Sequence, residues 1–155
     1  MWVKICGLTT AESVADAIES GADAVGFVFA ESVRAVSIEQ AILLAGIARG
    51  HAEVVAVMKH PDPALAAEVQ ARLQPDRVQT DVADFATFEL LPGIAGTPVY
   101  RDNSLIEESD LPPRFLYEGD VSGSGEVADW QRAQRLAARG ELILAGGLSP
   151  GNVAD

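Results

Sequence analysis

Short apolar runs alternate with longer segments of helical periodicity along almost the whole chain. Seven apolar runs predict strands, at residues 3–6, 24–29, 53–58, 77–79, 97–100, 114–118 and 142–145. Several of these runs are apolar throughout, which is typical of parallel strands that are covered on both faces. Strands that alternate with helices predict a parallel α/β sheet whose helices form the crossover connections.

Residues that favour helix N-termini precede the helical segments. These capping residues are Thr10, Ser37, Asp62, Asp129 and Ser149. After Ser37, Gln40 completes a capping-box pattern, and Gly21 ends the first helix in a position that tolerates left-handed backbone. Residues 101–113 are polar and end in proline, so they predict a loop with at most one helical turn.

Seven strand–helix units at short spacing favour a closed (β/α)8 barrel over an open doubly wound sheet. We expect residues 1–155 to form one barrel domain. An eighth strand is not visible, and the smallest barrels have ~200 residues, so we expect the barrel to be C-terminally incomplete. A segment missing from the sequence is the explanation that we favour. The alternative is an open sheet edge covered by association.

The composition is acidic, with 11 Lys and Arg against 23 Asp and Glu and a net charge of −12. Binding to nucleic acid depends on clustered cations, so we expect no nucleic-acid partner. An apolar content of 48% predicts a folded core. No secretory signal and no apolar stretch near the ~18 residues of a membrane span are visible, so we expect no membrane partner and a soluble cytoplasmic protein.

The only cysteine, Cys6, fits a reducing compartment and excludes an intrachain disulfide or a multi-cysteine zinc site. Reacting groups of barrels lie at the C-terminal ends of strands. The candidates predicted there are Cys6, Arg34, His60, Gln79, Asp81, Arg101, Glu118, Gly146 and Gly147. A thiol and a carboxyl group on different strands can serve as base and acid toward one small substrate.

Each candidate also has an ordinary structural explanation. A buried cysteine often only packs, exposed charges are common, and Gly146-Gly147 can form a tight turn. His60 and Asp81 are more typical of loop residues than of catalysts, and SGSG at 122–125 is too short to indicate phosphate binding. The residues alone therefore predict an enzyme-like barrel and no particular reaction.

Five sequence segments occur in a distinctive order. They are VKICGLT at 3–9, GADAVGFVFAESVRAVS at 21–37, VAVMKHPDP at 55–63, GSG with DW at 129–130, and ILAGGLSPGNV at 143–153. In this order they resemble the phosphoribosylanthranilate isomerase family of tryptophan biosynthesis. The resemblance implies a (β/α)8 barrel enzyme with a small phosphosugar substrate and with neither a metal ion nor a redox cofactor.

The resemblance implies an Amadori rearrangement, in which N-(5-phosphoribosyl)anthranilate becomes 1-(o-carboxyphenylamino)-1-deoxyribulose 5-phosphate. Cys6 matches the general base, whose thiolate nearby cations or strand-end amides would stabilise. Arg34 matches the arginine that holds the anthranilate carboxylate. Gly146 and Gly147 match half of a backbone site for the substrate phosphate. We count Gln79, at the end of the fourth strand, among the substrate-binding candidates.

The chain departs from the family at two positions. Glu118 stands where the family has an aspartate as general acid, and Asp120 is the rival donor. QTDV at 79–82 replaces the family's QLHG, so any contact of that histidine is lost or replaced. Two alternatives follow: a shifted or dual substrate, such as the related imine of histidine biosynthesis, or a catalytically silent incomplete barrel that needs a partner to close. The sequence assigns no oligomeric state.

Overall fold

The computed structural model describes residues 1–106, 108–122 and 125–153. The chain divides into two compact units, Met1–Gly96 and Thr97–Asp155. The boundary lies within strand β5 (Ala95–Arg101). The single barrel domain expected over residues 1–155 remains a prediction.

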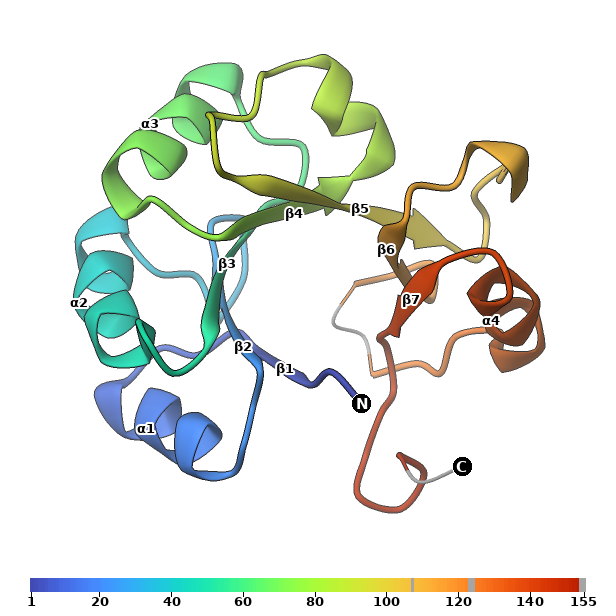
Figure 1. Ribbon diagram of the computed structural model, residues 1–155, viewed down its shortest axis with the longest axis horizontal. Coiled ribbons are helices and arrows are strands. Elements are labelled where there is room, and N and C mark those ends of the chain that lie inside the picture. The colour runs from blue at the N-terminus through green and yellow to red at the C-terminus, as the bar shows by residue number, and fades with distance from the viewer. Residues whose placement is uncertain (107, 123–124, 154–155) are drawn as a thin grey trace. The chain divides into compact units, whose positions relative to one another are not determined.

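The first unit contains four parallel strands that pair in chain order. They are β1 (Lys4–Cys6), β2 (Ala24–Val28), β3 (Glu53–Val57) and β4 (Arg77–Asp81). Three helices connect them: α1 (Ala11–Glu19), α2 (Ile38–Ala48) and α3 (Pro63–Leu73). Figure 1 shows these helices along one side of the four strands. The register places Cys6 opposite Gly26, and Val57 opposite Gln79.

The core of this unit lies between the strands and the helices. Side chains of the strands that join it are Val25, Phe27, Val54, Ala56 and Val78, all fully buried. Successive side chains of a strand point to opposite faces. Gly26, Val57 and Gln79 therefore belong to the other face, which is the interior face in a barrel.

Helix caps follow the sequence prediction closely. Thr10, Ser37 and Asp62 each accept a hydrogen bond from the first turn of α1, α2 and α3, respectively. One detail of the prediction is wrong. Gln40 does not complete a capping box at Ser37, because its Nε2 donates instead to the carbonyl of Thr9, at 2.7 Å. This contact ties α2 to the segment that follows β1.

Strand ends agree with the prediction to within two residues. The largest differences are in β4, which continues through Thr80 to Asp81, and in β5, which starts at Ala95 and ends at Arg101. A short 3-10 helix that the sequence analysis did not predict, η1 (Val82–Ala86), follows β4 directly. Asp81 is therefore the last residue of a strand and not the loop residue that the sequence suggested.

The second unit contains β5, β6 (Arg114–Glu118) and β7 (Glu141–Leu144), parallel and paired in chain order. Helix α4 (Trp130–Ala137) begins at its predicted cap, Asp129. A 3-10 turn, η2 (Glu108–Asp110), is the one helical turn described in the loop before β6, as predicted for the described part of residues 101–113. The buried core includes Tyr100 and Phe115, whose rings meet edge to face with 5.7 Å between their centroids.

Asp102, next to the end of β5, anchors this unit's loops. Its carboxylate accepts hydrogen bonds from the Tyr117 hydroxyl at 2.5 Å and from the backbone N–H of Asp129. Burial and this hydrogen bond raise the pKa of Tyr117, so the hydroxyl keeps its proton and acts as the donor. Arg132 donates to the backbone carbonyls of Asp102 and Ser104, which joins α4 to the same loop.

The structure describes the first residues of the helix expected at Ser149-Pro150. Val153 N–H donates to the carbonyl of Ser149 at 2.9 Å, which closes a single turn at the end of the described residues. Residues beyond 153 lie outside the described part of the chain, so the helix remains a prediction. Among the described residues, no helix combines the length and apolar character that crossing a membrane requires.

Candidate functional site

Cys6 is the last residue of β1, and its sulfur lies next to Gly26 of the adjacent strand β2, which has no side chain. A methyl group placed on Gly26 of the adjacent strand would lie 3.0 Å from Cys6 Sγ and 3.3 Å from Val57 Cγ2. The backbone N–H of Gly7 donates to the Gly26 carbonyl at 2.8 Å, which fixes the end of β1 against β2. Glycine at position 26 therefore sets the place of the thiol.

Arg34 lies in the loop after β2 and packs across Gly7, the neighbour of Cys6. A methyl group on Gly7 would lie 2.8 Å from Arg34 Cδ and 3.1 Å from its Nε, and Gly7 has a φ of +79°. Both observations require glycine there. Within the described residues, the Arg34 guanidinium forms no hydrogen bond or ion pair. It is a planar cation suited to bind both oxygens of a carboxylate beside the thiol.

Gln79 is buried on β4, with only 7% of its surface exposed. Its side-chain oxygen, Oε1, accepts no hydrogen bond from any residue that the structure describes. A buried acceptor without a donor costs free energy, which a donor on a bound molecule would recover. The assignment of Gln79 to substrate binding remains a prediction, in which Oε1 would accept a hydrogen bond from the substrate.

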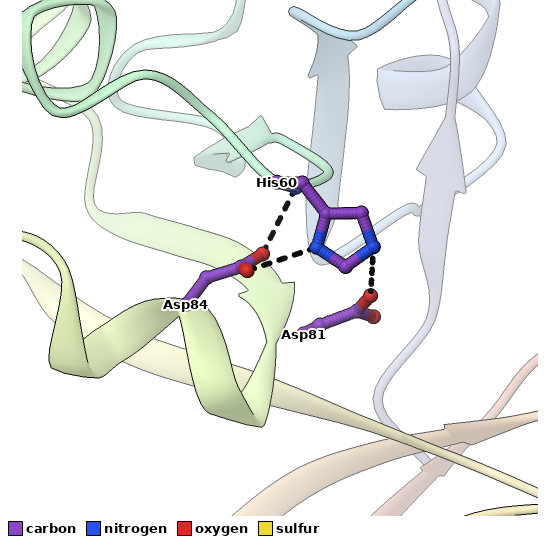
Figure 2. A group of neighbouring side chains, drawn as sticks. All are labelled: His60, Asp81 and Asp84. Atoms are coloured by element: carbon purple, nitrogen blue, oxygen red, sulfur yellow. Dashed lines mark hydrogen bonds and ion pairs between the residues drawn. The ribbon is translucent and has the colours of Figure 1, made fainter.

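His60, Asp81 and Asp84 form a polar cluster that joins the ends of β3 and β4 (Figure 2). His60 Nδ1 lies 3.0 Å from Asp84 Oδ1, and Nε2 lies 3.3 Å from Asp81 Oδ2. The backbone N–H of His60 also donates to Asp84 Oδ2, at 3.0 Å. His60 adopts a left-handed φ of +47°, which is strained for a residue other than glycine. The Asp84 contacts hold it in that conformation.

Asp84 is the buried centre of this cluster. Burial raises the pKa of its carboxyl group, but hydrogen bonds from Thr80 and His60, together with the charge of His60, outweigh burial, so the pKa is lowered. Asp84 is not among the residues predicted from the sequence, because a carboxylate in an unpredicted 3-10 turn gives no signal of its contacts. The sequence also did not indicate that His60 would contact Asp81.

The same cluster contains the donor types that bind metal ions. One ligand atom from each of His60, Asp81 and Asp84 lies within 4.8 Å of the others. Both ring nitrogens of His60 already contact carboxylates of the cluster, Nδ1 that of Asp84 and Nε2 that of Asp81. The observed contacts are those of a hydrogen-bonded bridge between the ends of β3 and β4.

The bridge should stabilise the first unit in a pH-dependent way. Both carboxylate oxygens of Asp84 accept hydrogen bonds, and Asp84→Asn replaces one of them by an amide nitrogen that cannot accept. We therefore expect the free energy of unfolding at pH 7 to fall by about 1–3 kcal/mol. The lowered pKa of Asp84 means that its contribution is present above the pKa of the unfolded chain and is lost as the pH falls through the folded pKa.

Thermal unfolding from pH 7 to pH 3 measures this effect. The difference in Tm between the unsubstituted chain and Asp84→Asn should shrink as the pH falls below about pH 4. Asp16→Asn is the matched control, because Asp16 is exposed on α1. A Tm difference for Asp84→Asn that does not change with pH would contradict the stabilising role of this carboxylate.

In the second unit, Glu118 ends β6 with its side chain largely buried. Its Oε1 lies 3.0 Å from Arg101 Nη2, and the Ser122 hydroxyl donates to the same oxygen at 2.6 Å. The rival carboxylate, Asp120, is exposed and accepts a hydrogen bond from the backbone N–H of Asn103 at 2.7 Å, which is a loop-stabilising contact. Glu118 is therefore the more buried of the two carboxylates, and its role as general acid remains a prediction.

Gly146 and Gly147 follow β7 in left-handed conformations, with φ of +89° and +64°. A methyl group on Gly147 would lie 2.7 Å from the backbone nitrogen of Val127, so this turn has no room for a side chain. Within the described residues, the N–H groups of both glycines donate no hydrogen bond. Such free amides can bind an anion. Of the SGSG segment, Gly123 and Ser124 lie outside the described residues.

Comparison with known proteins identifies a family. Residues 3–155 match the family described as N-(5'phosphoribosyl)anthranilate (PRA) isomerase. The N-(5'-phosphoribosyl)anthranilate isomerase of Streptococcus gordonii is 38% identical over 157 residues, which cover 99% of this chain and 79% of that protein. The chain therefore spans about four fifths of the length of this relative.

Solved structures of the same family have a similar fold. The phosphoribosyl anthranilate isomerase of Thermus thermophilus has a TM-score of 0.80 at 27% identity, covering 99% of this chain and 80% of its own. A structure in complex with reduced 1-(o-carboxyphenylamino)-1-deoxyribulose 5-phosphate has a TM-score of 0.73 at 27% identity, covering 99% and 79%. The (β/α)8-barrel class predicted from the sequence is confirmed. The chain belongs to the N-(5'-phosphoribosyl)anthranilate isomerase family.

Proposed function

We propose that this chain isomerises N-(5'-phosphoribosyl)anthranilate to 1-(o-carboxyphenylamino)-1-deoxyribulose 5-phosphate in tryptophan biosynthesis, with Cys6 as general base and Glu118 as general acid. The observation that carries the proposal is the family match over residues 3–155. The positions of Cys6 at the end of β1 and of Glu118 at the end of β6 support the two roles, because barrel enzymes place reacting groups at these strand ends.

The reaction needs one proton donor and one proton acceptor. Glu118 protonates the ring oxygen of the ribose while the anilino nitrogen lone pair forms a C1=N bond, so the C1–O bond breaks and the ring opens. Cys6 then removes the C2 proton, the C–H electrons form the C1=C2 bond of an enaminol, and the π electrons of the C1=N bond return to the nitrogen as its lone pair. Loss of the enol proton and protonation at C1 give the ketone. Atoms are conserved overall, so the reaction is an isomerisation.

The remaining site residues bind the substrate in this proposal. The Arg34 guanidinium pairs with the anthranilate carboxylate. Arg34 packs against Gly7, the neighbour of the proposed base Cys6, and this contact supports the role. The amides of Gly146 and Gly147 bind the phosphate, with the left-handed turn holding them in place. Gln79 supplies a buried acceptor. A free cysteine as general base suits a reducing compartment, so we also propose a cytoplasmic location.

Turnover by the unsubstituted chain tests the proposal. Loss of the anthranilate fluorescence of the substrate reports the reaction, and complementation of a strain that lacks this step reports it in cells. Turnover of the related imine of histidine biosynthesis, assayed in parallel, would support the dual-substrate alternative. Absence of turnover with either substrate by a folded chain would contradict the proposed function and favour the catalytically silent alternative.

Gly26 gives a prediction about the placement of the thiol. Gly26→Ala adds a methyl group 3.0 Å from Cys6 Sγ, so the sulfur or Val57 must move by a few tenths of an ångström or more. Displacements approaching 1 Å reduce rates by about 100-fold, so we expect kcat to fall by about 10- to 100-fold. Steady-state kinetics measure the effect.

Gly46→Ala is the matched control for this substitution. Gly46 lies in α2 and has no atom within 4 Å of the added methyl group. An alanine in a helix interior is favourable, so Gly46→Ala should keep kcat and raise Tm slightly. Equal kcat for both variants would show that Gly26 does not set the position of the thiol.

A further inference from the structure

Arg101, Ser122 and Glu118 form a closed set of contacts between the end of β5 and the end of β6. Arg101 Nη2 donates to Glu118 Oε1 at 3.0 Å and to Ser122 Oγ at 2.9 Å. Ser122 Oγ in turn donates to Glu118 Oε1 at 2.6 Å. The Arg101 and Glu118 side chains are only 14% and 13% exposed, so solvent screens their contact weakly.

The contacts distinguish the two oxygens of Glu118. Both donors reach Oε1, whereas Oε2 accepts no hydrogen bond from any residue within the described ranges. In a protonated carboxyl group one oxygen is a carbonyl acceptor and the other carries the proton. The arrangement therefore favours Oε1 as the carbonyl oxygen and Oε2 as the hydroxyl that can donate.

Arg101 is itself held firmly. It is the last residue of β5, and its backbone N–H donates to the Ser104 hydroxyl at 3.0 Å. The next residue, Asp102, is the anchor that binds Tyr117 and the start of α4. The guanidinium therefore extends from a fixed backbone, which is a requirement for a residue that positions another group.

We propose that Arg101 and Ser122 are positioning residues that hold Glu118 through Oε1 and leave Oε2 to deliver the proton. This inference rests on the proposed function. Glutamate has one more rotatable bond than aspartate, so a donor carboxyl at this strand end has more conformations to lose before it reaches a fixed point. The two contacts from Arg101 and Ser122 restrict that freedom. Once Oε2 has released its proton, the guanidinium stabilises the carboxylate that remains.

A double-mutant cycle with steady-state kinetics tests the inference. We expect Arg101→Met to lower kcat by about 10- to 100-fold and Ser122→Ala by about 3- to 10-fold, with KM changed less than kcat, because binding groups lie elsewhere. Arg101→Lys keeps the charge but not the planar fork, and should recover part of the rate. In a Glu118→Gln background, Arg101→Met should lower kcat by less than about 2-fold further.

Arg114→Met is the matched control. Arg114 also pairs with a glutamate of the same unit, and its Nε lies 2.8 Å from Glu141 Oε2. This pair lies where β6 and β7 begin, whereas Glu118 lies where β6 ends. Arg114→Met should leave kcat unchanged, and Tm values of all variants report folding. If Arg101→Met fails to fold, the same comparison is made with Ser122→Ala and Arg101→Lys, each with and without Glu118→Gln.

The outcomes separate the inference from the function on which it rests. Equal losses of kcat from Arg101→Met with and without the Glu118 carboxyl group would overturn the positioning role alone, as would unchanged kcat in Arg101→Met. No turnover by the unsubstituted chain would instead contradict the proposed function. Losses that disappear in the Glu118→Gln background would support Arg101 acting through Glu118.

Discussion

Cys6→Ala should lower kcat for the isomerisation by about 10²- to 10⁴-fold, the range typical of a lost general base. The substitution removes the chain's only cysteine, and with it the thiol that the mechanism uses as base. Alanine is smaller than cysteine and adds no clash there, so Tm should change little. Fluorescence kinetics and thermal unfolding measure the two effects.

Cys6→Ser separates base chemistry from packing. A hydroxyl group fills nearly the same space as the thiol but does not ionise near neutral pH, so this variant should be about as slow as Cys6→Ala. Since Cys6 is the only cysteine, alkylation with iodoacetamide should also inactivate the unsubstituted chain, and bound substrate should slow that reaction. Turnover by Cys6→Ala equal to that of the unsubstituted chain would remove Cys6 from the mechanism.

Glu118→Gln should lower kcat by a comparable factor, about 10²- to 10⁴-fold, because glutamine keeps the shape of the side chain but has no acidic proton to transfer. Its amide can still accept from Arg101 and Ser122, so the fold of the second unit should be preserved.

Asp120→Asn is the matched control for Glu118→Gln. Asp120 is exposed and its carboxylate binds the backbone N–H of Asn103, a contact that asparagine can keep through its side-chain oxygen. We expect kcat close to that of the unsubstituted chain. A large loss in Asp120→Asn, with activity retained in Glu118→Gln, would transfer the acid role to Asp120.

Local sequence patterns predicted most of the framework. All seven strands occur where apolar runs were found, and Thr10, Ser37, Asp62 and Asp129 cap helices as expected. These features depend on contacts within one turn of helix or on the apolar character of a few consecutive residues, so the chain's local order specifies them. The capping box predicted for Gln40 is wrong, because its side chain binds the distant Thr9 carbonyl instead of the nearby backbone of Ser37.

Candidate chemistry was only partly visible from the sequence. Cys6 and Glu118 were selected because they lie at predicted strand ends and because the sequence resembles a family. Neither criterion predicts which side chains surround them in the folded chain. The space that Gly26 leaves for the thiol depends on the register between β1 and β2. The choice between Glu118 and Asp120 depends on burial, which consecutive residues do not reveal.

The sequence by itself determined the alternation of strands and helices, the caps, the acidic surface charge and the family to which the chain belongs. Only the tertiary structure decided which side chains meet: His60 with Asp81 and Asp84, Arg34 with Gly7, and Arg101 with Ser122 and Glu118. The physical reason is range. Caps and periodicity act over three or four residues, whereas these contacts join residues 17 to 27 positions apart, and strand register and loop geometry place them.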